Sequence, residues 1–132
     1  MNQLGGTIES IEVSGSLSLV RVRAGALLLS AIIIDTPETL DYLAIGNKVT
    51  AVFKEAEVVL GHDAELPISL QNRIPGSVAA IERGTLLSRV MLDTAVGSIV
   101  SVITSNAVAQ LGLEVGSAAV ALVKTNEIML SA

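Results

Sequence analysis

The sequence predicts a mainly β protein built from two tandem copies of one small five-stranded unit. Aligned with itself at an offset of 70 residues, the chain has fourteen identical positions over roughly sixty without a gap, among them Asn2 with Asn72 and Lys54 with Lys124. Chance would give only a few, so each half is one copy of a repeated unit. Short stretches of alternating apolar and polar residues recur between glycine-containing turns, a pattern typical of β-strands. Helix-start signals are weak outside one segment in each copy.

The elements of the first copy follow one another at short intervals. Strands are expected over residues 7–13, 17–23, 27–34, 48–54 and 57–60. The third of these is rich in leucine and β-branched residues, which predicts a strand buried on both faces. Asp35 followed by Pro37 is typical of a helix start, because aspartate caps a helix and proline suits its first position. A short helix is therefore expected over about 37–43.

The second copy repeats this plan. Its strands are expected over residues 77–82, 87–93, 98–104, 118–124 and 127–130, with a helix over about 106–111. Five short strands with one helix before the fourth are typical of an OB-like barrel. The predicted architecture is thus two tandem OB-like five-stranded β-barrels, each with one short helix. The first covers residues 1–62 and the second 68–132, and the linker at 63–67 is so short that the barrels should pack closely.

The composition favours burial of apolar surface beyond one small core. Hydrophobic residues make up 51% of the chain, charged residues only 16%, and the mean hydropathy is +0.68. A unit of about sixty residues buries only ~60% of the surface of its unfolded chain. The excess is best explained by contacts between copies and between subunits of a homo-oligomer, with a very apolar core as the alternative.

Several partners and locations are not expected. The longest apolar run, residues 24–34, is too short for a membrane-spanning helix of ~20 residues. No basic leader precedes an apolar segment and there is no cysteine, which fits a cytoplasmic protein. The net charge of −5 falls on residues 1–66, which hold four basic and nine acidic residues, whereas residues 67–132 hold four of each. Without a basic face, nucleic acid is a poor partner.

No set of residues typical of catalysis or metal binding emerges. The one histidine, His62, lies near the linker and is expected to be a solvated loop residue. Glu55 and Glu57 are expected to decorate an exposed strand end. There is no nucleophile elbow, no phosphate-binding loop and no cluster of carboxylates at metal-ligand spacing. We therefore expect a binding protein and not an enzyme, with no direct metal-ion ligands and no organic cofactor.

The polar residues present in both copies are the candidates for binding. Lys54 and Lys124 each close the fourth strand, where an ammonium group can face an anion beside free backbone N–H groups or lie along the surface. Asn2 and Asn72 precede the first strand and can either bind their own backbone in a turn or present an amide to a ligand.

The second copy is the better half for an anion. Ser105 opens its helix, whose N-terminus favours negative charge, whereas the first copy has Asp35 at that position. Ser69 and Gln71, just upstream of Asn72, add a hydroxyl and an amide. Neutral donors with one or two positive charges suit a small tetrahedral oxyanion.

Ordered motifs in the second copy resemble those of the Mop or molbindin domain, a member of the TOBE group. A unit of that family begins with a pattern like S-A-R-N and continues through A-x-[IV]-T, L-x-x-G and V-x-A-x-[IV]-K-x-[ST]-x-V-x-L. The corresponding segments here are Ser69-Leu70-Gln71-Asn72, Ser101-Val102-Ile103-Thr104, Leu113-Glu114-Val115-Gly116 and the run from Val120 to Leu130. The first copy matches from Asn2, without the positions that precede it, and Gln71 replaces the family arginine, so a donor is kept and a charge is lost.

The resemblance implies a cytoplasmic protein that binds molybdate or tungstate for storage and assembles as a trimer. The anions would lie at subunit interfaces, held by backbone amides, hydroxyl groups and the strand-end lysine. The residues predicted to bind the oxyanion are Ser69, Gln71, Asn72, Thr104, Ser105, Lys124 and Thr125, with Asn2 and Lys54 as weaker copies.

Two other roles are compatible with the same fold. Such units also occur as sensor modules of DNA-binding regulators or transporter ATPases, so this chain would then act on a separate partner chain. Alternatively, the chain is a structural oligomerisation module whose anion site has decayed, a possibility that the change to Gln71 favours.

Overall fold

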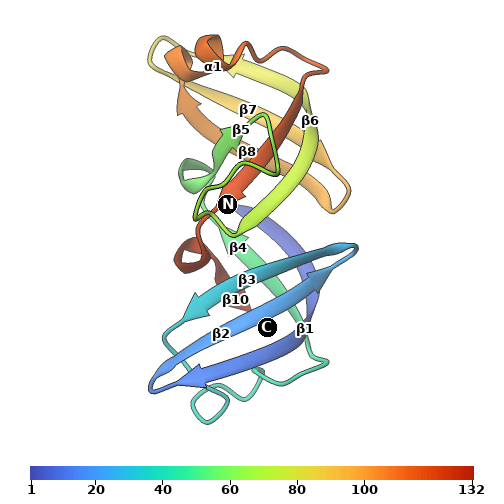
Figure 1. Cartoon of the computed structure of the whole chain (residues 1–132), viewed down its shortest axis with the longest axis vertical. Coiled ribbons are helices and arrows are strands. Elements are labelled where there is room, and N and C mark those ends of the chain that lie inside the picture. Colours follow the sequence, from blue (N-terminus) through green and yellow to red (C-terminus); the bar gives the residue numbers. More distant parts are fainter.

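A computed structural model describes all 132 residues and shows two curled antiparallel sheets stacked end to end (Figure 1). The first sheet contains, in spatial order, β10 (Met129–Ser131), β4 (Lys48–Phe53), β1 (Asn2–Ser14), β2 (Leu17–Ala24) and β3 (Leu27–Ile33). The second contains β5 (Val59–Gly61), β9 (Ala118–Val123), β6 (Asn72–Arg83), β7 (Leu87–Thr94) and β8 (Gly97–Thr104). The predicted fold class, mainly β with two five-stranded units, is confirmed.

The two repeats exchange their last strands. Strand β10, from the second repeat, pairs with β4, and β5, from the first repeat, pairs with β9. Each crossing begins at a three-residue 3₁₀ turn, η1 (Glu55–Glu57) or η2 (Thr125–Glu127), which comes after the fourth strand. Figure 1 shows β10 in the lower unit and β5 in the upper one. Each sheet is therefore completed by the other half of the chain.

Long, bent first strands organise each unit. Strand β1 pairs with β4 through its first half and with β2 through its second, and a register shift between Ile8 and Ser10 marks the bend. A Cβ atom on Gly6 would lie 2.7 Å from the carbonyl oxygen of Arg23, and one on Gly76 2.5 Å from that of Asp93. This close backbone approach accounts for the glycine found at both positions.

The main hydrophobic core is shared by the two repeats. Nineteen buried residues form one cluster, which includes Leu4 and Phe53 of the first repeat and Ile74 and Val123 of the second. A smaller cluster of five buried residues around Ile8 fills the outer part of the first unit. The alternation of apolar residues along each strand directs one face of each sheet into these cores.

The two predicted helices have different outcomes. The second copy contains α1 (Ser105–Leu111), which ends at Gly112 in the left-handed conformation, with φ 61°. The prediction of a helix over 37–43 is wrong, because this segment makes two separate hydrogen-bonded turns, closed at Thr36–Leu40 and Leu40–Leu43, and does not continue as an α-helix. Threonine and aspartate at positions 39 and 41 are poorer helix formers than the alanines at 107 and 109.

The chain contains no apolar helix of the length that a membrane span requires.

Three details of the predicted strands are also corrected. Strand β3 is an edge strand on which buried residues such as Leu29 and Ala31 alternate with more exposed ones, so it is not buried on both faces. Strands β1 and β6 begin at Asn2 and Asn72, which therefore lie within the strands instead of preceding them. Glu57 and Glu127 belong to the 3₁₀ turns, so the last strands begin two residues later than expected.

Candidate functional site

The predicted lysines both lie at the junction of the two units, which we call the waist. Strand β9 ends at Val123, the partner of Asn72 on β6, so Lys124 and Gln71 are the next residues at these adjoining strand ends. In the same way β4 ends at Phe53, the partner of Asn2, and Lys54 is the next residue. Both lysines are exposed, and neither forms an ion pair.

The two asparagines join the units. Asn2 donates to the carbonyl oxygen of Val100 and accepts from its N–H, both at 2.8 Å. Asn72 makes the equivalent pair of bonds to Ser30, at 2.9 and 2.7 Å, and also donates to the carbonyl of Val123. Both side chains are buried, with 4% and 1% of their surface exposed. Their amides are thus committed to the opposite unit and not free to meet a ligand in this conformation.

Thr104 and Ser105 lie far from the waist, at the outer end of the second unit. The Thr104 hydroxyl accepts from the N–H of Ala107 and caps α1, and the Ser105 hydroxyl donates to the carbonyl of Gly84. Gly84 lies just beyond the end of β6 opposite to Asn72. Within one chain both hydroxyls are therefore bound to groups at this outer end and not to groups at the waist.

The segment before Asn72 is arranged around Arg73. The Nη atoms of Arg73 donate to the carbonyl oxygens of Ala64, Leu66 and Ile68. Its Nε donates to the carbonyl oxygen of Leu70. Arg73 lies two residues after Gln71, the position of the missing family arginine, and its side chain is occupied by carbonyl groups of residues 64–70. The side chains of Ser69 and Gln71, in contrast, are exposed at the waist and make no hydrogen bond within the chain.

The two lysines have different neighbours along the chain. After Lys124 comes Thr125, half-buried in η2, whereas after Lys54 comes Glu55, whose carboxylate lies 3.2 Å from the guanidinium of Arg89. Glu55 was expected to decorate an exposed strand end, and that prediction is wrong, since its side chain is only 25% exposed. The hydrogen bonds that Arg89 donates to the carboxylates of Glu82 and Glu55 raise the pKa of Arg89, so this guanidinium stays charged. The signal in the sequence was that Glu55 and Thr125 occupy equivalent positions of the two repeats but differ in charge.

His62 is an exposed loop residue, as the sequence predicted, but its ring makes one contact that the sequence did not indicate. Its Nε2 lies 2.7 Å from the carbonyl oxygen of Leu111, the last residue of α1. A ring N–H there satisfies one of the carbonyl groups that a helix end leaves unpaired. The linker is therefore held at both ends, by His62 on the helix and by Arg73 at the start of β6.

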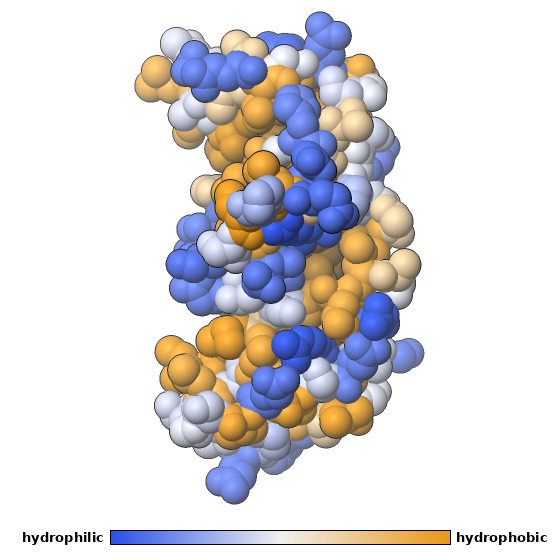
Figure 2. Space-filling view, in the orientation of Figure 1, coloured by the Kyte–Doolittle hydropathy of each residue, from blue (hydrophilic) through white to orange (hydrophobic).

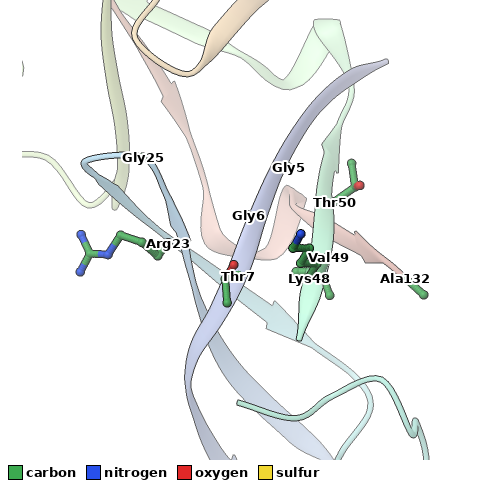
Figure 3. Close-up of a pocket in the computed structure, with 9 residues that line it drawn as sticks. All are labelled: Gly5, Gly6, Thr7, Arg23, Gly25, Lys48, Val49, Thr50 and Ala132. Carbon is green, nitrogen blue, oxygen red and sulfur yellow. The ribbon is translucent and has the colours of Figure 1, made fainter. Parts of the chain in front are cut away.

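The largest hollow of the surface lies elsewhere. It has a volume of about 570 Å³ and lies over Gly5 and Gly6, beside Thr7 and Lys48. Figure 3 shows the Arg23 side chain extending away from Lys48, and Glu9 binds its guanidinium at 3.0 Å. None of the predicted oxyanion-binding residues lines this hollow or the two smaller ones. No group of three histidine, aspartate or glutamate side chains is placed to hold a metal ion.

Comparisons with known proteins cover both repeats. The profile of the TOBE domain matches residues 1–60 and 68–130. The chain is 32% identical over 133 residues to the molybdenum transport protein ModE of Herbaspirillum seropedicae, a match that covers 98% of this chain and 49% of ModE. It is 35% identical over 66 residues to a probable molybdenum-pterin-binding protein of Haemophilus influenzae, covering 49% of this chain and 96% of that protein. The chain thus spans about half the length of its ModE relatives.

A solved structure resembles the whole chain. The cytoplasmic molybdate-binding protein ModG, crystallised with molybdate bound, superimposes with a TM-score of 0.92 at 31% identity. The match covers 98% of this chain and 94% of that one. Since the family profile matches twice, at the positions of the two sequence repeats, the resemblance noted from the motifs is confirmed, and the chain belongs to the TOBE domain family.

Proposed function

We propose that this protein binds molybdate or tungstate and stores or buffers the anion in the cytoplasm without transforming it. The observation that carries the proposal is the likeness, over nearly the whole chain, to a protein crystallised with molybdate bound. The ModE and molybdenum-pterin-binding relatives, whose names also refer to molybdenum, support it.

The waist of the second repeat has groups suited to a tetrahedral dianion. Lys124 supplies one mobile positive charge, and the hydroxyl of Thr125 and the exposed side chains of Ser69 and Gln71 supply neutral donors. Few charges and several hydrogen-bond donors allow selection by size and protonation state as well as by charge. The ligand is a bound oxyanion, and the proposal needs no metal-ion ligand of the protein and no organic cofactor.

We place the complete site at an interface between copies of the chain, in a homo-oligomer for which a trimer is favoured. Within one chain the hydroxyls of Thr104 and Ser105 are engaged at the start of α1, so a second copy is the proposed source of the remaining donors. Large apolar side chains left in water support association: Ile34, Ile45, Leu86 and Val115 are 77%, 70%, 79% and 69% exposed. Figure 2 shows apolar residues on the surface of both units.

A regulatory role is the second candidate. The pair of repeats corresponds to about half of ModE, so the same module also occurs within a longer protein. In that case the chain would sense the oxyanion and act on a separate regulator or transporter chain.

Equilibrium dialysis with molybdate, tungstate and sulfate, together with sedimentation velocity, tests the proposal. We expect uptake of molybdate or tungstate in preference to sulfate, and a sedimenting species larger than one chain. Absence of uptake of all three anions would favour the purely structural role. Oxyanion binding that changes the affinity for a DNA-binding or ATPase chain would favour the regulatory one.

A further inference from the structure

The two waist positions are related by the sequence repeat but differ in chemistry. Lys54 and Lys124 are equivalent, yet the next residue is an acid, Glu55, in the first repeat and a hydroxyl residue, Thr125, in the second. The 3₁₀ turn that carries Glu55 contacts β8, and the turn that carries Thr125 contacts β3. The two turns thus occupy corresponding places on opposite units.

The carboxylate of Glu55 is held by positive groups. Its Oε1 accepts from Nε and Nη2 of Arg89 at 3.3 and 3.2 Å, and its Oε2 lies 3.7 Å from the amino group of Met1. Arg89 is oriented from its other side by Glu82, its cross-strand partner on β6, at 3.3 Å. An arginine fork held in this way fits two oxygens of a carboxylate or of an oxyanion equally well.

The second repeat has no counterpart of this ion pair. The repeat places Leu19 where Arg89 lies and Gln71 where Met1 lies. At the positions that correspond by the repeat, the second repeat thus has no arginine and no ion-paired carboxylate, whereas the first has both.

We propose that Glu55 is a built-in substitute for the bound anion, which fills the waist position of the first repeat and leaves only that of the second open. This inference rests on the proposed function, and it identifies Glu55 as the residue that determines how many oxyanions each chain takes. A dianion approaching Lys54 must displace a carboxylate that is bound to the cationic group it would itself use. At the position of Thr125 there is no such competitor.

Removing the carboxylate of Glu55 should also affect how tightly the waist position of the first repeat binds an anion. With Glu55 replaced by threonine, the first repeat offers an exposed lysine, a hydroxyl and an arginine that is held by Glu82 alone, whereas the second offers a lysine and a hydroxyl only. The opened position is thus expected to bind molybdate more tightly than the natural one, because the arginine fork binds two oxygens at once.

The test is the number of molybdate ions bound per chain at saturation, measured by equilibrium dialysis on the full chain. We expect Glu55→Thr and the isosteric Glu55→Gln to bind one ion more per chain than the natural protein. Glu57→Thr is the matched control, since it removes one negative charge from the same turn but leaves the pair of Glu55 with Arg89 intact. Adding Arg89→Leu to Glu55→Thr reproduces the second repeat at this position and should remove the gain in affinity.

The outcomes separate the two proposals. If the natural protein binds molybdate and both folded Glu55 variants bind the same number of ions, the inference about Glu55 is wrong and the proposed function stands. If Glu57→Thr adds an ion as well, the effect is one of overall charge and the inference is again wrong. If neither the natural protein nor the variants bind the anion, the proposed function fails. Circular dichroism and thermal unfolding show that each variant is folded.

Discussion

The side-chain amides of Asn2 and Asn72 act as short pieces of strand. An amide offers the same donor and acceptor as a peptide group, so it can pair with the exposed N–H and C=O of an edge residue. Val100 and Ser30 lie on β8 and β3, the outermost strands of the two sheets. Each asparagine thus covers part of a free sheet edge, which would otherwise be open to pairing with other chains.

Replacing these asparagines should destabilise the protein, the second one more than the first. Asn72→Ala removes three hydrogen bonds and Asn2→Ala removes two, all with backbone groups of the waist. Leaving buried polar groups without partners costs ~1–3 kcal/mol each, so we expect a loss of about 2–3 kcal/mol for Asn72→Ala. Urea unfolding of the two variants and the natural protein measures this loss of unfolding free energy. Unchanged stability with weakened oxyanion binding would instead show that Asn72 is a ligand.

The two lysines should contribute unequally to binding. Lys124→Ala is expected to weaken molybdate uptake more than Lys54→Ala. The reason is that Lys124 is followed by the hydroxyl residue Thr125, whereas Lys54 is followed by the acidic residue Glu55. Both lysines are exposed, so neither change should alter the free energy of unfolding much. Dialysis of the two variants side by side provides the measurement, and equal losses would contradict the asymmetry.

Sequence duplication identified these residues more readily than their roles. Asn72 and Lys124 stand out because they recur at an offset of 70, but the partner of Asn72 lies 42 residues away in the other repeat. A contact between residues so far apart in the chain cannot be predicted from the residues around either of them. The sequence around Glu55 is typical of a surface position, because the arginine that holds this carboxylate belongs to the second copy.

At the scale of single elements, the glycines of β1 have unequal importance. A Cβ on Gly6 would lie within 3 Å of the Arg23 carbonyl and the Val22 side chain, whereas one on Gly5 would have no neighbour within 4 Å. We expect Gly6→Ala to destabilise the protein by ~1–3 kcal/mol through crowding and Gly5→Ala to change stability by less than ~0.5 kcal/mol. Thermal unfolding of the two variants is a direct comparison, and similar midpoints would show that the bend of β1 adapts.

The elements were predicted with uneven success for physical reasons. Strand alternation and turn glycines located every strand, because a half-buried sheet imposes a period of two on the sequence. The segment 37–43 carries the start signals of a helix but not the residues that sustain one, so it forms isolated turns. In the second copy the alanines and Val108, which is buried against the core, supply what the first lacks.

At the scale of the whole molecule, the exchange of β5 and β10 could not be predicted from the repeats. Both closing strands are short, and both fourth strands present similar apolar faces, so either pairing satisfies the same pattern. The exchanged pairing is favoured by the 3₁₀ turns and by the shared core, which bring the last strand of one repeat to the sheet of the other.

Deleting residues 129–132 should therefore damage the first unit, although the deletion lies in the second repeat. Strand β4 would lose its partner on one side, while β9 would keep both β5 and β6. Hydrogen exchange measured by mass spectrometry should show faster exchange for peptides containing Thr50 to Val52 than for those containing Ala121 to Val123. Faster exchange confined to β9 would contradict the exchanged topology.

The crossed closing strands also constrain how this chain can have changed since its duplication. A substitution within residues 59–61 is selected by its fit to the later half, and one within 129–131 by its fit to the earlier half. Either half on its own would lack its closing strand unless a second copy supplied one. The mutual completion of the two copies explains how they could diverge at most positions and still keep a common plan.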